Sequence, residues 1–222
     1  MSLPTLYSLR RCPYAMRARM GLILANQPVM LRDIVTRNKP PELIEANPKG
    51  TVPIIVLDHS ASTETDPTVI AESLDIMLWA LKQNDPHDVL RDSQVDLAKE
   101  ILELIKLNDT QFIPMLEQYR ASYRYHNDDL EDRRLQCLTL VAPLEARLAK
   151  HKFLFGDNPS LADYALMPFI SQFARVEKKW FVQSEYGNIA QWLKAHYESA
   201  LYTKIMRQYP QWIESGEEFL FD

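Results

Sequence analysis

The pattern of apolar residues changes type near residue 85, and this change limits the possible folds more than any other feature of the sequence. Before it, short apolar runs alternate with helical patterns, which is typical of a mixed α/β fold. From Asp92 onward the apolar residues follow helical spacing. The residues between, Asn84-Asp85-Pro86-His87-Asp88, are rich in types that break regular structure. We therefore predict an α/β domain over residues 1–84, a linker over 85–91 and an all-α domain over 92–222.

The first eighty residues predict strands and helices in a definite order. A strand over 5–9, a helix over 14–26 and a strand over 29–34 form a strand–helix–strand unit. Such a unit normally places its two strands parallel, with a right-handed crossover. The elements predicted next are a short helix (42–46), a strand (52–57), a hairpin loop (58–67), a strand (68–70) and a helix from Glu72 onward. This βαβαββα order is that of a thioredoxin-like domain.

The second half carries signals that favour structural roles. Pro114 lies inside a long helical pattern and is expected to bend or interrupt it. Cys137 lies on the apolar stripe of the next helix, so we interpret it as core. Asp163 ends a Ser-x-x-Asp capping box, so we interpret its carboxylate as structural. A last helix is predicted over 202–214, and the apolar tail at 219–221 either docks in a groove or frays.

Composition and charge exclude several classes of function. The chain has 222 residues, 46% of them hydrophobic, and a formal net charge of -5. Because a general nucleic-acid binder needs a basic face, we expect no nucleic-acid partner. The sequence shows neither a signal peptide nor an apolar run near the roughly 18 residues of a membrane helix. We therefore expect a cytoplasmic protein with no membrane partner, and no Cys/His spacing indicates a metal.

Cys12 is one of only two cysteines and has an informative position. It stands directly before a proline, where a predicted strand gives way to a helix. A thiol at a helix N-terminus meets partial positive charge and free N–H groups, which favour the thiolate. Arg10, Arg11 and Arg17 are close enough in sequence to add to that field, whereas Arg17 and Arg19 are equally well interpreted as solvated helix surface. From this stretch alone, Cys12 is either a reactive sulfur or a small buried hydrophobe.

Four motifs together resemble the soluble glutathione transferase superfamily. They are Cys12-Pro-Tyr-Ala, Asn47-Pro-Lys-Gly-Thr-Val-Pro53, Glu72-Ser73 and Phe155-Gly-Asp-Asn-Pro-Ser-Leu-Ala-Asp163. The resemblance covers nearly the whole chain. The cysteine at the N-terminal active position makes the chain similar to the omega-like transferases and to the two-domain glutaredoxin. The resemblance implies a thioredoxin-like α/β N-terminal domain, an all-α C-terminal domain and glutathione as co-substrate. Homodimers are common in this superfamily, but the sequence leaves the oligomeric state open.

The resemblance also implies how glutathione is held. Val52 pairs its backbone with the cysteinyl part of glutathione, next to a cis Pro53. Glu72 meets the ammonium of the γ-glutamyl end, and Ser73, with the helix N-terminus, meets its carboxylate. Tyr14 flanks the thiol. Taken alone, the proline is also compatible with a simple edge strand, and the Glu-Ser pair with a helix cap that holds no ligand.

The glycyl carboxylate of glutathione needs a basic partner. In the omega-like pattern an upstream lysine meets this carboxylate, and Lys39 is its nearest counterpart here. Lys49 and Arg37 are nearby alternatives.

The Cys12-Pro-Tyr-Ala15 motif implies a particular reaction. The cysteine attacks a mixed disulfide or another electrophilic glutathione adduct and takes up the glutathionyl group. Ala15 stands where the glutaredoxin motif has its second cysteine, so release requires an external thiol. We therefore predict a glutathione-dependent thiol transferase or reductase whose second substrate is a small electrophile or disulfide. The alternative is a non-enzymatic binding or regulatory module of the same fold, of the stringent starvation protein A type.

The acceptor site is expected between the two domains. Tyr119, Tyr123 and Tyr125 are candidates for its walls, because aromatic side chains suit a flat hydrophobic co-substrate. Covering the core is an equally good interpretation of these tyrosines.

Overall fold

The structure, a computed structural model of the chain, describes residues 2–57 and 68–222. The hairpin loop predicted at 58–67 lies outside the described residues. The chain divides into two compact units. The first comprises Met1–His87 and Ala200–Asp222, and the second comprises Asp88–Ser199. Among the helices that the structure describes, none is both long and apolar enough to cross a membrane.

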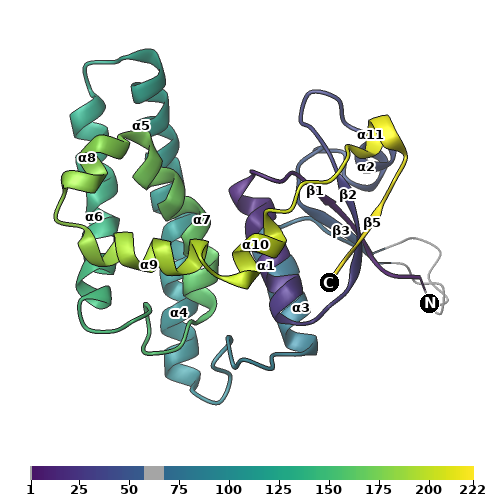
Figure 1. The fold of residues 1–222 in the computed structure, drawn as a ribbon, viewed down its shortest axis with the longest axis horizontal. Helices are drawn as coiled ribbons and strands as arrows, with labels where there is room; N and C mark the ends of the chain where they lie inside the picture. The colour runs from purple at the N-terminus through teal and green to yellow at the C-terminus, as the bar shows by residue number, and fades with distance from the viewer. Residues whose placement is uncertain (1, 58–67) are drawn as a thin grey trace. The chain divides into compact units, whose positions relative to one another are not determined.

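The first unit is built on a five-stranded mixed sheet (Figure 1). Its elements are, in chain order, β1 (Thr5–Ser8), α1 (Pro13–Leu24), β2 (Val29–Asp33), α2 (Pro41–Ala46), β3 (Ile54–Leu57), β4 (Thr68–Ile70), α3 (Ser73–Gln83), α10 (Ala200–Ile205), α11 (Trp212–Ser215) and β5 (Phe219–Phe221). The strand order is β4-β3-β1-β2-β5. β1 and β2 pair in parallel, whereas the other pairings are antiparallel. The predicted βαβαββα order and the parallel strand–helix–strand unit are therefore confirmed.

Helices cover both faces of this sheet. Successive residues of a strand point to opposite faces, so the buried Leu6 and Tyr7 of β1 belong to different layers. Tyr7 packs with Leu43 of α2, and α1 and α3 pack against each other on the other face (Figure 1). The α1–α3 contact is close because Gly21 has no side chain. A Cβ at that position would lie 2.6 Å from the Cα of Met77.

The C-terminal segment differs most from prediction. Residues 219–221 form β5, which pairs with β2, and α10 packs against α1. The tail therefore docks as a strand. Residues 200–222 belong to the first unit and not to the helical domain predicted over 92–222. The single last helix predicted over 202–214 is also wrong, because α10 and α11 are separate. Pro210 lies between them, and its missing N–H prevents a continuous helix.

The second unit consists of helices. They are α4 (Val95–Leu107), η1 (Asn108–Phe112), α5 (Ile113–Tyr125), α6 (Leu130–Leu148), α7 (Leu161–Val176), α8 (Lys178–Gln183) and α9 (Gly187–Tyr197). The short α8 was not predicted. η1 is a π-helical turn that joins α4 to α5 and ends two residues before Pro114. Proline cannot donate a backbone hydrogen bond, and a wider turn before it accommodates the missing donor. The interruption predicted at Pro114 is therefore a local change of helix type.

α7 lies at the centre of the second unit, and nearly all of its residues are buried. Asp163, in its first turn, is completely buried. Its carboxylate accepts hydrogen bonds from the backbone N–H of Leu154 (2.9 Å), from the N–H and hydroxyl of Ser160 (2.8 and 2.9 Å) and from the indole of Trp192 (2.9 Å). The structural role predicted for Asp163 is confirmed, and so is the burial of Cys137 in the core.

His196 of α9 is buried in an aromatic environment. Its ring centroid lies 4.9 Å from that of Trp192 and 5.7 Å from that of Tyr164. Its Nε2 has no hydrogen-bond partner among the described residues. Because burial disfavours the charged imidazolium, it lowers the pKa of His196 to about 4. Protonation of this ring therefore favours the unfolded chain, where histidine titrates near pH ~6.5.

We expect the stabilising effect of a neutral His196 to be complete above pH ~6.5 and to be lost as the pH falls towards about 4. This group alone should lower the free energy of unfolding by about 3 kcal/mol over that range. Urea unfolding at several pH values measures the change. His196→Phe, which keeps an aromatic ring, should flatten the profile, whereas the exposed His151→Phe should not. Equal slopes in the wild type and His196→Phe would contradict this account.

Candidate active site

Cys12 lies between the end of β1 and the start of α1. It occupies the N-cap position of α1 with extended backbone angles, and Pro13 follows as the first helical residue. Proline fits this position because its fixed φ suits a helix and its missing N–H has no partner to lose there. The N–H of Cys12 donates to the carbonyl of Leu9 at 3.1 Å, which closes the turn. The thiol is free and partly exposed.

A cavity of about 500 Å³ opens at this thiol. All seven site residues named from the sequence line it: Cys12, Tyr14, Lys39, Val52, Pro53, Glu72 and Ser73. They come from four separate parts of the first unit. Five further lining residues were not predicted as part of the site: Leu9, Thr36, Gly50, Thr51 and Ala71. Gly50 and Thr51 lie inside the Asn47–Pro53 motif, which was a usable signal, whereas nothing in the sequence marked Thr36.

The Val52–Pro53 segment crosses the cavity just before β3. The peptide bond between the two residues is cis, as the resemblance implied. The pairing of β3 with β1 runs from Ile54 to Val56. The backbone of Val52 therefore lies beyond the paired part of the strand and faces the cavity side of the sheet edge.

Glu72 and Ser73 stand at the N-terminus of α3. Glu72 is the N-cap residue and is exposed, whereas Ser73 is the first helical residue and is buried. The Glu72 side chain makes no capping hydrogen bond. The alternative interpretation, in which the Glu-Ser pair is only a helix cap, required such a bond from the Glu72 carboxylate. The first N–H groups of α3 add partial positive charge at the same place.

Three basic residues were candidates for binding the glycyl carboxylate, and Lys39 is the one at the cavity. It lines the cavity, while Lys49 and Arg37 do not. Its Nζ lies 3.2 Å from the point where a Cβ on Gly50 would be. Gly50 has a φ of +61°, a conformation that favours glycine. A side chain at this position would be strained and would crowd the lysine.

The electrostatics of Cys12 differ from prediction. Burial raises the pKa of its thiol. Hydrogen bonds from the backbone N–H groups of Ala15 and Tyr14 oppose this effect, as does the charge of Arg19, but burial is the larger influence. The predicted effect of the helix N-terminus on the thiolate is therefore present, but burial outweighs it.

The structure excludes one of the two interpretations of Arg17 and Arg19. Arg17 and Arg19 each have only 1% of their surface exposed, so neither is solvated helix surface. The guanidinium of Arg19 donates a hydrogen bond to the carbonyl of Arg10. The charge acting on the Cys12 thiol comes from Arg19, for which the sequence left a role near the thiol and a solvated surface position equally open.

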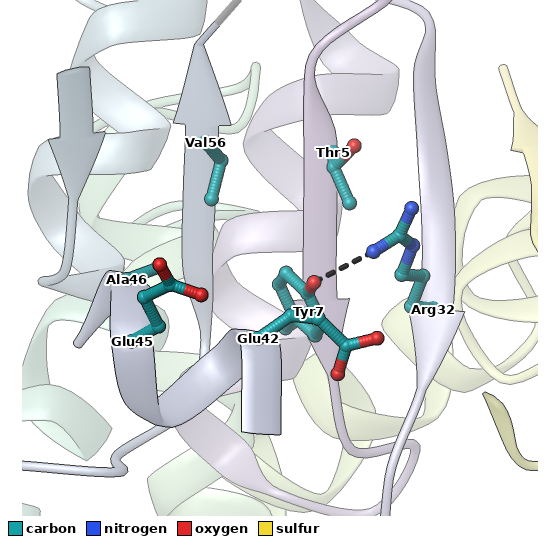
Figure 2. A pocket seen from close by; sticks show the side chains of 7 residues that line it. All are labelled: Thr5, Tyr7, Arg32, Glu42, Glu45, Ala46 and Val56. Carbon is teal, nitrogen blue, oxygen red and sulfur yellow. Dashed lines mark hydrogen bonds between the residues drawn. The ribbon is translucent and has the colours of Figure 1, made fainter. Parts of the chain in front are cut away.

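The first unit contains a second hollow, of about 520 Å³, on the α2 side of the sheet (Figure 2). Figure 2 shows Arg32 reaching from β2 to the hydroxyl of Tyr7, to which its Nη1 donates at 2.7 Å. The same guanidinium bonds Glu218 at 2.9 Å and stacks on Trp212. None of the predicted site residues lines this hollow. Arg32 is already engaged by the C-terminal segment, so this hollow is not the candidate active site.

The tyrosines proposed as acceptor walls fall into two groups. Tyr119 is fully buried and its hydroxyl donates to Glu177 at 2.7 Å, so it belongs to the core. Tyr123 and Tyr125 are exposed, with 48% and 69% of their surfaces accessible. Tyr123 borders a hollow between α5 and α7.

Comparison with known proteins shows the family. The model described as "Glutathione S-transferase, N-terminal domain" matches residues 6–88, and the corresponding C-terminal domain model matches residues 133–195. Together they cover about two thirds of the chain and fit its mixed-sheet unit and its helical unit. The chain belongs to the glutathione S-transferase family.

Individual relatives point in the same direction. Glutathione S-transferase omega-1 of Mus musculus is 26% identical over 174 residues, which cover 78% of this chain and 68% of the relative. The fold is similar to a glutathione transferase family member from Pseudomonas fluorescens pf-5, crystallised with two glutathione bound (TM-score 0.78, 17% identity, 92% of each chain). It is also similar to glutathione transferase Omega 1C from Trametes versicolor (TM-score 0.76, 19% identity, 93% of this chain and 92% of that one).

The two cysteines should differ in reactivity. Burial raises the pKa of the Cys137 thiol to about 12, and that side chain is inaccessible. We expect iodoacetamide to label Cys12 alone in the folded protein. The rate should rise about tenfold per pH unit up to pH ~9, because only the thiolate reacts. Mass spectrometry of peptides after timed labelling measures both sites. A Cys12 rate that levels off below pH ~8 would show that burial does not dominate this thiol.

Proposed function

We propose that this protein is a glutathione-dependent thiol transferase or reductase in which Cys12 accepts a glutathionyl group. The observation that carries the proposal is the free, partly exposed Cys12 thiol at the N-terminus of α1, facing a cavity lined by the predicted glutathione-binding residues. Membership of the glutathione S-transferase family supports it. So does the likeness to relatives named as omega-class enzymes.

The proposed glutathione pose follows from the charges and backbone around the cavity. Glutathione has two carboxylates, one ammonium and an extended backbone. The unpaired backbone at Val52 suits the cysteinyl part, which would add to the sheet edge like a short strand. Glu72 would meet the ammonium, and Ser73 with the N-terminus of α3 would meet the γ-glutamyl carboxylate. Lys39 would meet the glycyl carboxylate, and Tyr14 would flank the sulfur.

The proposed reaction has two thiol–disulfide exchange steps. In the first, the Cys12 thiolate attacks the glutathionyl sulfur of a mixed disulfide, the new disulfide joins Cys12 to glutathione, and the substrate leaves as a thiolate. In the second, a free glutathione thiolate attacks the same glutathionyl sulfur, forms oxidised glutathione and releases Cys12 as a thiolate. Ala15 replaces a second cysteine, so an external thiol must perform the second step.

A cytoplasmic setting agrees with this reaction, because it keeps the thiol reduced and supplies glutathione. The second substrate belongs to the class of small disulfides or electrophilic glutathione adducts. A homodimer is part of the proposal by analogy with the family.

Cys12→Ser should abolish glutathionyl exchange, because a serine hydroxyl cannot form the mixed disulfide. We expect wild type to gain the mass of one glutathionyl group when mixed with oxidised glutathione, and to lose it with excess reduced glutathione. The variant should show neither change and should retain less than about a hundredth of the turnover with a small mixed disulfide.

Cys137→Ser is the matched control and should behave as wild type, since Cys137 is buried. Exchange turnover that survives Cys12→Ser would exclude this nucleophile. A protein that neither binds glutathione nor takes up the glutathionyl group would favour the binding or regulatory module over an enzyme.

Lys39→Gln should weaken glutathione binding about tenfold, because it removes a charge-assisted hydrogen bond to the glycyl carboxylate. Lys49→Gln removes the same charge on the other side of α2 but lies outside the cavity lining, so its effect should be less than about twofold. Isothermal titration of each Cys12→Ser double variant separates binding from chemistry. Equal losses in the two lysine variants would contradict the assignment to Lys39.

A further inference from the structure

A group of buried charges lies behind the turn that carries Cys12. Arg19 of α1 is 1% exposed and Asp33, at the end of β2, is 9% exposed. Neither is in contact with the glutathione cavity. Charged groups are costly to bury, and replacing buried charges with apolar groups often stabilises a protein. A buried arginine and aspartate at this place therefore need an explanation beyond stability.

The helix geometry directs Arg19 towards the thiol turn. Arg19 follows Cys12 by seven residues, which is close to two helical turns, so the two residues share one face of α1. Side chains on a helix lean towards its N-terminus. The Arg19 guanidinium accordingly reaches the carbonyl of Arg10, two residues before Cys12, and donates a hydrogen bond to it. The N–H of Cys12 is bonded to Leu9 within the same turn.

Asp33 holds the same turn from the sheet side. Its carboxylate accepts a hydrogen bond from the backbone N–H of Arg10. The two groups bonded to the Arg10 backbone, one to its carbonyl and one to its N–H, have opposite charges. The hydrogen-bonding capacity of these two side chains is not fully used, since the Asp33 Oδ1 and the Arg19 Nε have no partner among the described residues. Neither charge is fully neutralised by local bonds, and the field of Arg19 extends to the neighbouring sulfur.

The C-terminal segment closes the cluster on its remaining side. The Arg10 side chain donates to Gln208 at 3.1 Å, and Asp33 forms an isolated bridge with Gln211. The titratable and charged groups that face Arg19 are Asp33, Cys12, Tyr209 and Arg10. Burial lowers the pKa of Arg19 to about 10, so it remains a cation at neutral pH. Cys12 in turn is faced by Arg19 and by the N–H groups of Tyr14 and Ala15.

We propose that Arg19 is a positioning residue for Cys12: its buried guanidinium fixes the turn that carries the thiol and stabilises the thiolate by its charge. Arg19 acts through the Arg10 carbonyl and through the electric field, and it touches no substrate. Asp33 moderates this charge from the opposite side of the turn. A role of Arg19 in turnover rests on the proposed function, but its effect on the ionisation of the Cys12 thiol does not.

The test is the pH profile of Cys12 alkylation by iodoacetamide, measured by mass spectrometry without glutathione. Arg19→Met removes the charge and should slow labelling at pH ~8 by roughly five- to tenfold, because less thiolate is present. The rates should converge with those of wild type only at a pH high enough to ionise the thiol in both proteins. Arg19→Lys, which keeps a charge, should recover most of the rate. Arg17→Met is the matched control, an equally buried arginine of α1, and should stay within about twofold of wild type.

A second variant keeps the proposal open to refutation if Arg19→Met does not fold. Asp33→Asn retains an oxygen for the Arg10 N–H but removes the negative charge facing Arg19, so labelling at pH ~8 should become about two- to fivefold faster. A wild-type profile in Arg19→Met, or in Asp33→Asn, would overturn the proposal. So would a slow Arg19→Met rate that Arg19→Lys does not recover at all. Because no glutathione is used, these outcomes stand apart from the loss of glutathionyl uptake that would refute the proposed function.

Discussion

The balance between desolvation and local positive charge at the Cys12 sulfur is the constraint on which the rest of the site depends. The cavity must be enclosed enough to hold a ligand, and that enclosure itself disfavours the thiolate. The start of α1 counters it with two N–H groups, and Arg19 counters it with a full charge. The position of the turn between β1 and α1 therefore decides both the shape of the site and the reactivity of its sulfur.

The cavity could be predicted from sequence because its parts are the ends of regular elements. The Cys12-Pro turn, the Val52-Pro53 segment and the Glu72-Ser73 pair each carry residue types that mark an element boundary. Because β3 pairs antiparallel with both β1 and β4, the C-terminal end of β1, the start of β3 and the end of β4, which leads into α3, lie at one edge. Local signals were sufficient there because the topology brings those boundaries together.

The parts that could not be predicted depend on contacts between residues far apart in the chain. β5 lies almost 190 residues after its partner β2, and a three-residue apolar tail gives no indication of a partner. Arg17 and Arg19 are of a residue type that usually lies at the surface, and tertiary packing around α1 buries them. The direction of the Cys12 pKa was missed for the same reason, since burial is a tertiary property and the helix dipole is a local one.

The raised pKa of Cys12 also bears on how a single thiol can be recycled. In the proposed second step the Cys12 thiolate is the leaving group, and a thiol of high pKa leaves slowly. No internal cysteine offers an alternative, because Ala15 occupies the resolving position and Cys137 is buried with a pKa of about 12. A positive charge near the sulfur helps both steps, since Cys12 enters the first and leaves the second as the same anion. The buried Arg19 is the kind of group that a one-cysteine cycle requires and a two-cysteine cycle could omit.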